Sequence, residues 1–89
     1  MKAIVTVIGK DTKGIIAKVS NFLFERDINI EDISQTIMQD FFSMVMMVNI
    51  EDIKTPFSVI AKECDNLGKE LGLEIRIQSE EIFNAMHRI

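Results

Sequence analysis

Apolar residues recur along the chain with two different periods, and the shorter period marks four β-strands. Alternation of apolar residues, or a run that is apolar at nearly every position, predicts strands over residues 3–8, 28–38, 41–50 and 73–79. The first and third are apolar on both faces, which is typical of central strands, and the fourth is apolar on one face only. In the second strand the alternation slips between Ile30 and Ile33, which indicates a β-bulge. Gln39 and Asp40 are expected to form a tight turn.

The longer period, with apolar residues at every third or fourth position, predicts three helices. The first is capped by Asp11 and ends near residue 26 or 27. The second starts with a Thr55 cap followed by proline at the first helical position, and Gly72 stops it in a left-handed conformation. The third lies in the C-terminal segment EEIFNAMHRI, where Ser79 is the predicted cap. Its apolar side carries Ile82, Phe83, Met86 and Ile89.

The order of these elements predicts an α+β fold, the ferredoxin-like β-α-β-β-α-β plait. This fold has a four-stranded antiparallel sheet with two helices on one face, and strands 3–8 and 41–50 would lie in its centre. Residues 1–79 would form this domain, and residues 80–89 a short amphipathic tail helix. The other face would expose apolar side chains, which monomers rarely do, so the tail, a second subunit or both are expected to cover it. We therefore expect a homodimer.

Composition and charge narrow the class of partner. The chain has 89 residues, 47% of them hydrophobic, and a net charge of −4 with ten scattered basic residues, which argues against direct nucleic-acid binding. The RNA-binding RRM shares the order of elements, but this chain has no Tyr or Trp and no aromatic residue in its first strand. No leader and no apolar stretch long enough to span a membrane is seen. With Cys64 as the single cysteine, no internal disulfide is possible and a cytoplasmic location is expected.

Side chains that could carry catalysis or bind a metal have simpler structural explanations. Cys64 falls on the apolar stripe of the second helix and is expected in the core, and His87 has no second ligand at metal-binding spacing. Four methionines are interpreted as core packing, namely Met38, Met44, Met46 and Met47. Four acidic residues lack the periodicity of a calcium loop and are interpreted as solvated charges, namely Glu31, Asp32, Glu51 and Asp52. We therefore expect no enzyme activity, no metal and no cofactor.

The segment GKDTKGI, residues 9–15, joins the first strand to the first helix and is the strongest candidate for a site. Its two glycines match the spacing of a phosphate-binding P-loop, but Ile15 and Ile16 stand where that loop needs Lys and Ser or Thr. Nucleotide hydrolysis is therefore not expected. The free N–H groups at a helix start attract an anion, and Gly14 would let a ligand approach the backbone closely.

The stretch from Val5 to Ile30 resembles the ACT domain, a small-molecule-sensing plait of enzymes of amino-acid metabolism. The family pattern D-[RK]-P-G-[IL]-[LIV]-A-x-[VI] is matched by DTKGIIAKV, starting at Asp11, and its G-[IV]-N-I by DINI, ending at Ile30. Lys13 replaces the loop proline and Asp27 the glycine. The chain as a whole is similar to the small stand-alone bacterial ACT proteins that resemble the glycine cleavage system transcriptional repressor.

The resemblance implies a non-catalytic regulatory module that binds an amino acid or similar small carboxylate metabolite at a homodimer interface and signals to a partner protein. By this resemblance the ligand-binding residues are Asp11, Thr12, Lys13, Gly14, Ile15 and Asn29. The serine-sensing members carry His and Asn where this chain has Gly9 and Asp11, so their specificity is not transferred. Two alternatives stay open: Asp11 and Gly14 only cap and pack the helix, and the module is a structural interaction protein with no ligand.

Overall fold

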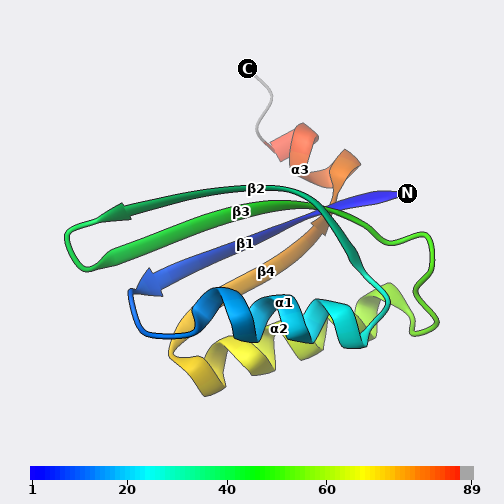
Figure 1. The fold of residues 1–89 in the computed structure, drawn as a ribbon. Coiled ribbons are helices and arrows are strands. Elements are labelled where there is room, and N and C mark those ends of the chain that lie inside the picture. The colour runs from blue at the N-terminus through cyan, green and yellow to red at the C-terminus, as the bar shows by residue number, and fades with distance from the viewer. Residues whose placement is uncertain (87–89) are drawn as a thin grey trace.

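The structure is a computed structural model that describes residues 1–86 of the chain. Two residues assigned above to the tail, His87 and Ile89, lie outside the described residues, as does the side chain of Met86. Figure 1 shows seven elements in the order that the sequence predicts. They are β1 (Lys2–Lys10), α1 (Ile15–Glu25), β2 (Asn29–Met38), β3 (Phe41–Asn49), α2 (Phe57–Leu71), β4 (Leu73–Ser79) and α3 (Glu80–Met86).

The four strands form one sheet in the order β2-β3-β1-β4, and every neighbouring pair is antiparallel. Helices α1 and α2 lie on one face of this sheet and α3 lies on the other (Figure 1). This is the predicted ferredoxin-like plait, with β1 and β3 in the centre and β2 and β4 at the edges. Among residues 1–86, no helix combines the length and the apolar content that a membrane crossing requires.

Local features of the backbone agree with the sequence at four places. The register of β2 against β3 shifts between Ile30 and Asp32, which is the predicted bulge. Gln39 takes a positive φ of 58° in the two-residue turn between β2 and β3. Asp27 and Gly72 follow α1 and α2 with φ of 59° and 72°, so each supplies the left-handed residue at which a helix commonly ends.

The helix caps differ from the prediction at two of three places. The α1 helix starts only at Ile15 and is preceded by Gly14 in a left-handed conformation, so Asp11 is too far from the first turn to cap it. No side chain caps α2 either, because Pro56 holds its N-cap position and the proline side chain has no hydrogen-bonding group. The predicted capping roles of Asp11 and Thr55 are therefore wrong. Ser79 does cap α3, and its Oγ accepts the Ile82 N–H at 3.2 Å.

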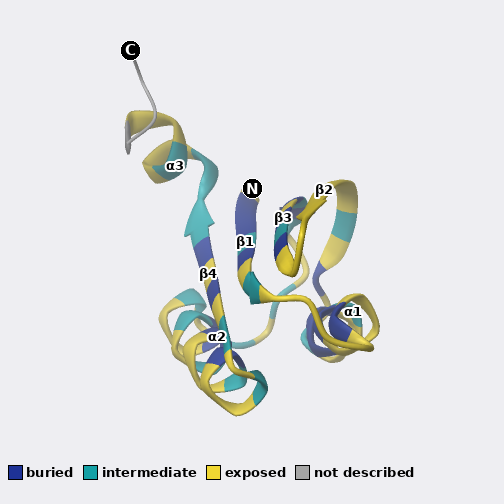
Figure 2. Cartoon of the chain, turned by 90° about the vertical axis from the view of Figure 1, so that its left-hand side faces the viewer, coloured by how far each residue is buried: buried dark blue, intermediate teal, exposed yellow. Residues whose placement is uncertain are grey.

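The core lies between the sheet and the two helices α1 and α2 (Figure 2). Inward residues of the sheet, such as Val5, Met46 and Ile75, pack there against Leu23 of α1 and Ile60 of α2. Cys64 of α2 is also fully buried, as expected, and its burial raises the pKa of the thiol to about 12. The thiol is therefore a protonated core side chain at neutral pH.

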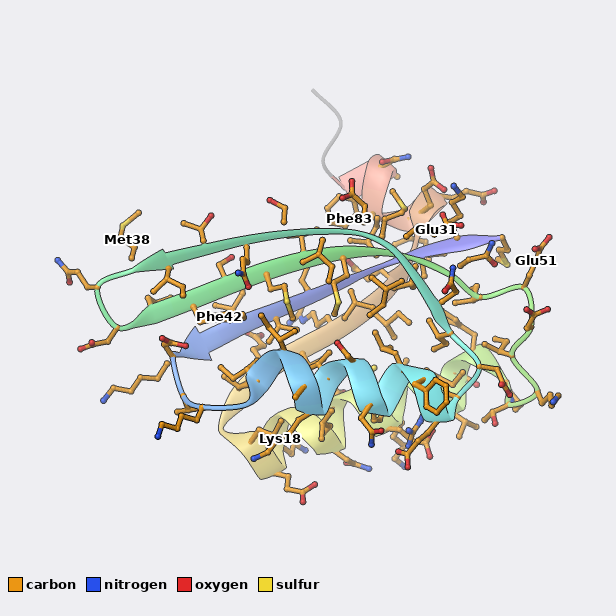
Figure 3. All side chains as sticks on the ribbon, viewed as in Figure 1. Lys18, Glu31, Met38, Phe42, Glu51 and Phe83 are labelled. Carbon is orange, nitrogen blue, oxygen red and sulfur yellow. The ribbon has the colours of Figure 1, made fainter. Side chains whose placement is uncertain are left out.

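The opposite face of the sheet, called here the open face, is covered only in part. Helix α3 packs against β1 and β4, and Ile4 beneath it is 5% exposed. At the other end of the face, Phe41 is 58% exposed and Met38 is 69% exposed. Met44 and Met46 are buried, but the prediction that Met38 packs in the core is wrong. Met38 pairs with Phe41 at the tip of the β2–β3 hairpin, beyond the reach of the helices (Figure 3).

Candidate functional site

A hollow of about 200 Å³ lies beside the β1–α1 loop, between the start of α1 and the edge strand β2. We call it the loop groove. It includes four of the six predicted ligand residues, Asp11, Thr12, Gly14 and Ile15. The remaining lining residues are Ile16, Ala17, Gln35, Ile37 and Phe42. Figure 3 shows Phe42 on β3 above the first turn of α1, where it closes the inner end of the groove.

The backbone of the loop leaves the start of α1 accessible. Gly14 has a φ of 79°, and a Cβ added there would meet nothing closer than the Lys18 Cε at 3.9 Å. No side chain caps α1, so the first N–H groups of the helix are not satisfied by a cap. The loop itself is fixed, because the Asp11 N–H donates to the Asp40 carbonyl at 2.8 Å and so ties it to the β2–β3 turn. Free N–H groups on a fixed loop suit an anionic group such as a carboxylate.

Gln35 contributes a polar side chain to the groove that the sequence analysis missed. It pairs with Met44 in the register of the sheet and therefore lies on the helix-covered face, between Ile33 and Ile37. A signal was present in the sequence, since Gln35 is the polar member of an otherwise apolar alternation. With Asp11 and Thr12, it gives the groove side-chain oxygens that can accept hydrogen bonds from an ammonium group.

Two predicted ligand residues are not brought to the groove in a single chain. Lys13 is exposed and is not among its lining residues. Asn29 opens β2 and pairs with Asn49, whereas the groove lies near the other end of β2, at Gln35 and Ile37. By register, Asn29 also shares the open face with Asn49. One chain therefore assembles the loop part of the predicted site without Asn29.

A side chain at the position of Gly9 would require the Leu73 side chain to shift. A Cβ placed there would lie 2.5 Å from the Leu73 Cδ2 and 3.3 Å from the Leu73 Cα, because β4 starts directly beside the end of β1. The ring of a histidine at this position would need Leu73 to move.

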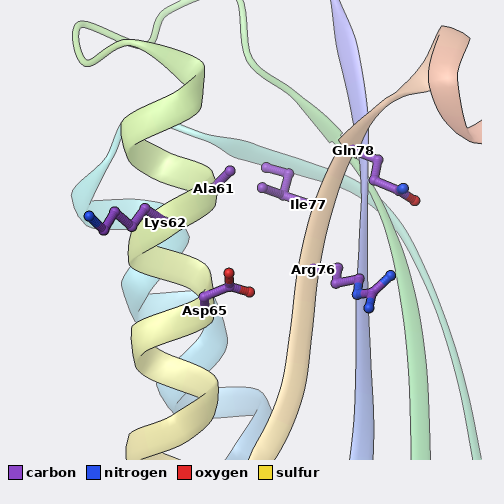
Figure 4. A pocket seen from close by; sticks show the side chains of 6 residues that line it. All are labelled: Ala61, Lys62, Asp65, Arg76, Ile77 and Gln78. Atoms are coloured by element: carbon purple, nitrogen blue, oxygen red, sulfur yellow. The ribbon is translucent and has the colours of Figure 1, made fainter.

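A larger hollow of about 490 Å³ lies between α2 and β4, on the far edge of the sheet. Figure 4 shows Asp65 pointing toward this gap, whereas Lys62 and Arg76 point away from it in opposite directions. Arg76 instead makes an ion pair with Glu74 at 3.3 Å. Because its charged groups do not converge, this hollow is a weaker candidate than the loop groove.

Comparison with known proteins gives relatives along the whole chain. A UPF0237 protein of Clostridium acetobutylicum is 54% identical over 89 residues, which is 100% of both chains. The solved structure of an ACT domain protein from Streptococcus pneumoniae matches with a TM-score of 0.82 and 44% identity over 93% of each chain.

Two more distant structures are regulatory by their names. A putative glycine cleavage system transcriptional repressor matches with a TM-score of 0.72 at 19% identity, over 86% of this chain and 44% of that one, which shows the shared fold. The regulatory subunit of aspartate kinase from Thermus thermophilus matches with a TM-score of 0.66 at 25% identity, over 86% of this chain and 50% of that one. The family model described as ACT domain matches residues 2–78. The chain therefore belongs to the ACT domain family.

Proposed function

We propose that this protein is a non-catalytic regulatory module that binds an amino acid or a similar small carboxylate metabolite in the loop groove. The observation that carries the proposal is the coincidence of this groove with the loop that the ACT pattern marks, at Asp11, Thr12, Gly14 and Ile15. Its volume of about 200 Å³ is below the roughly 300–1,000 Å³ of pockets for drug-sized ligands. A small metabolite is therefore the expected ligand.

The chemistry of the groove suits a zwitterion. The ligand carboxylate would accept hydrogen bonds from the N–H groups at the start of α1, near Gly14 and Ile15. The ligand ammonium would donate to Asp11 and Gln35, and Ile37 and Phe42 would contact an apolar side chain of the ligand. Lys13, at the exposed side of the loop, would add a positive charge near the carboxylate.

We place the functional homodimer at the free edge of β2. Every residue of β2 from Glu31 to Met38 is exposed, and Ile16 and Phe24 are exposed on the neighbouring helix α1. A two-fold axis at this edge would run the two β2 strands antiparallel, so the start of one strand meets the end of the other. The end of β2 that carries Asn29 in one subunit would then adjoin the end of β2 that borders the loop groove in its partner, with the Asn29 side chain on the open face. A ligand in the groove would therefore lie close to the dimer interface.

Regulation would follow from linkage between the ligand and the dimer. A ligand held by both subunits stabilises their association, and this change can be transmitted to a protein partner. The regulatory names of the repressor and of the aspartate kinase subunit support a signalling role for this chain. We propose a cytoplasmic location, because the buried thiol of Cys64 needs no oxidising compartment.

The alternative is a structural interaction module without a ligand. The exposed apolar side chains of the open face, Phe41 and Met38 among them, favour it, because such patches mark protein contacts. In that case the groove beside Gly14 would be a consequence of the left-handed turn before α1 and would bind nothing.

A thermal-shift screen of the twenty amino acids separates these two functions. An amino acid at 100 times its dissociation constant should stabilise the fold by about 2.7 kcal/mol. Ala17→Leu places a larger side chain in the groove from an exposed helical position and should abolish the shift. Asn21→Leu makes a similar change one turn further along α1, outside the groove, and should leave the shift intact. No shift with any amino acid at millimolar concentration would contradict the ligand-binding proposal.

A further inference from the structure

The open face carries an apolar patch that this chain leaves uncovered. Its residues are Ile8 of β1, Met38 of β2, and Phe41 and Val45 of β3, and each is exposed. They lie on the same side of the sheet, because Val45 pairs with Thr6 and Ile8 with Ser43, and Met38 lies opposite Phe41. We call this set the bare patch. It is separate from the loop groove, which lies on the helix-covered side of the sheet.

Helix α3 divides the open face into two parts. It follows Ser79, which pairs with Ala3, so it stands over the end of the sheet opposite to the bare patch. Figure 2 shows α3 outside the sheet, beyond the end of β4 and far from α1. The open face is thus covered by α3 only at one end, over β1 and β4, and the end that carries the bare patch is uncovered.

The thickness of α3 restricts what can cover the bare patch. Two sheets that pack directly face to face lie about 10 Å apart, which is about the diameter of one helix with its side chains. A second sheet therefore cannot pack directly over the half that α3 occupies. If α3 separates the two sheets, a gap about one helix thick remains between the second sheet and the bare patch. A partner must fill this gap with an element of the size of α3.

We propose that a second copy of this chain covers the bare patch with its own α3. A two-fold axis parallel to the sheets would put the α3 of each copy over the bare patch of the other, so that two helices fill the layer between two open faces. Each copy supplies one α3 helix and has one gap of the size of that helix. An unrelated partner has no such built-in match. The outer side of α3 is suited to this contact, because Ile82 is 55% exposed.

The charges at the two ends of the open face agree with this arrangement. Glu80 and Glu81 lie in the first turn of α3, and Glu81 is exposed. Lys10 is exposed at the end of β1, beside Phe41 and Met38 of the bare patch. The partner's helix would bring an acidic residue toward this lysine.

This face-to-face contact is independent of the proposed function. The ligand-binding dimer uses β2 and α1, whereas the present contact uses α3 and the open face. Both together would give an assembly of four chains with two kinds of interface. Substitutions on the open face should therefore change the mass of the assembly without changing the response to a ligand.

Light scattering on the full-length chain tests the proposal. Phe41→Glu and Ile82→Lys each place a charge in the contact at an exposed position, and each should halve the mass of the assembly. Val59→Glu is the matched control, because Val59 is exposed on α2, away from both surfaces, and its mass should equal that of the unchanged protein. Circular dichroism establishes that each variant is folded. The proposal is overturned if the unchanged protein is monomeric at high micromolar concentration. It is also overturned if Phe41→Glu and Ile82→Lys leave the mass of the assembly unaltered.

A charge exchange identifies the partner as a second copy. Lys10→Glu and Glu81→Lys should each weaken the assembly, and the double variant should regain a dissociation constant closer to that of the unchanged chain. If the effects of Lys10→Glu and Glu81→Lys on the dissociation constant simply add in the double variant, the placement of α3 over the bare patch is contradicted. The thermal shift with an amino acid should persist in all these variants, and its loss alone would count against the proposed function rather than against this contact.

Discussion

The two faces of the central strands have similar residues but different surroundings. On the helix-covered face, Val5, Val7 and Met46 are fully buried, whereas on the open face Ile8 and Val45 remain exposed. Both sets are apolar, and both belong to β1 and β3. The difference arises because α1 and α2 pack on one face over its central strands, while the seven residues of α3 cover only one end of the other. Apolar character thus marks both faces, and the helices decide which one forms the core.

The largest expected difference between the two faces is in how much a methionine side chain contributes to the free energy of unfolding. Met46→Ala removes a fully buried side chain from the helix-covered face and should lower the free energy of unfolding by about 2–5 kcal/mol. Met38→Ala makes the same chemical change at a position that is exposed in the single chain and should alter the free energy of unfolding of the monomer by less than about 0.5 kcal/mol. Urea denaturation measures both values. Equal losses in the assembled protein would show that Met38 is covered in solution, as the proposed contact over the bare patch requires.

Removal of residues 80–89 should expose the covered end of the open face. Ile4 is 5% exposed beneath α3, and leaving such a side chain in water costs about 1.5–3 kcal/mol. The truncated chain should therefore unfold at lower urea concentration and aggregate more readily, which light scattering and denaturation follow. A truncated protein with the same stability and solubility would show that α3 protects nothing.

The thiol of Cys64 reports on the closed face. Its pKa is raised to about 12 by burial, against 9.0 for an accessible thiol, so between these values the unfolded chain loses a proton that the folded chain keeps. The stability that this group contributes is present below pH 9 and is lost as the pH rises toward 12. In Cys64→Ala this part of the pH dependence should be absent. A thiol reagent at pH 8 should react with the native protein only as fast as it opens.

The smallest expected effect belongs to an ion pair of the open face. Lys2 Nζ lies 2.9 Å from Glu31 Oε1, and this contact lowers the pKa of Glu31 and raises that of Lys2. Its contribution is therefore present at neutral pH and is lost as the pH falls through the lowered pKa of Glu31. Because both groups are in water, Glu31→Gln should change stability only slightly, and salt should remove the difference. A large loss would indicate that a partner buries this pair.

Local sequence signals predicted much of the fold because they depend on near neighbours. The order of elements, the bulge after Ile30 and the left-handed residues Asp27 and Gly72 all follow from short-range patterns. The predicted capping roles of Asp11 and Thr55 are wrong because capping depends on the exact residue at which a helix starts. A capping residue must stand directly before the first turn, and the left-handed Gly14 and the extended Pro56 occupy these places.

The sequence by itself determined the strands, the helices and the loop that lines the groove, since these depend on periodicity and on residues close along the chain. Only the tertiary structure decided that Gln35 meets this loop, that Asn29 lies at the far end of β2, and that Met38 is exposed. These outcomes depend on strand register and on how far the helices extend across the sheet. Both are set by packing between segments distant in sequence, which no local pattern encodes.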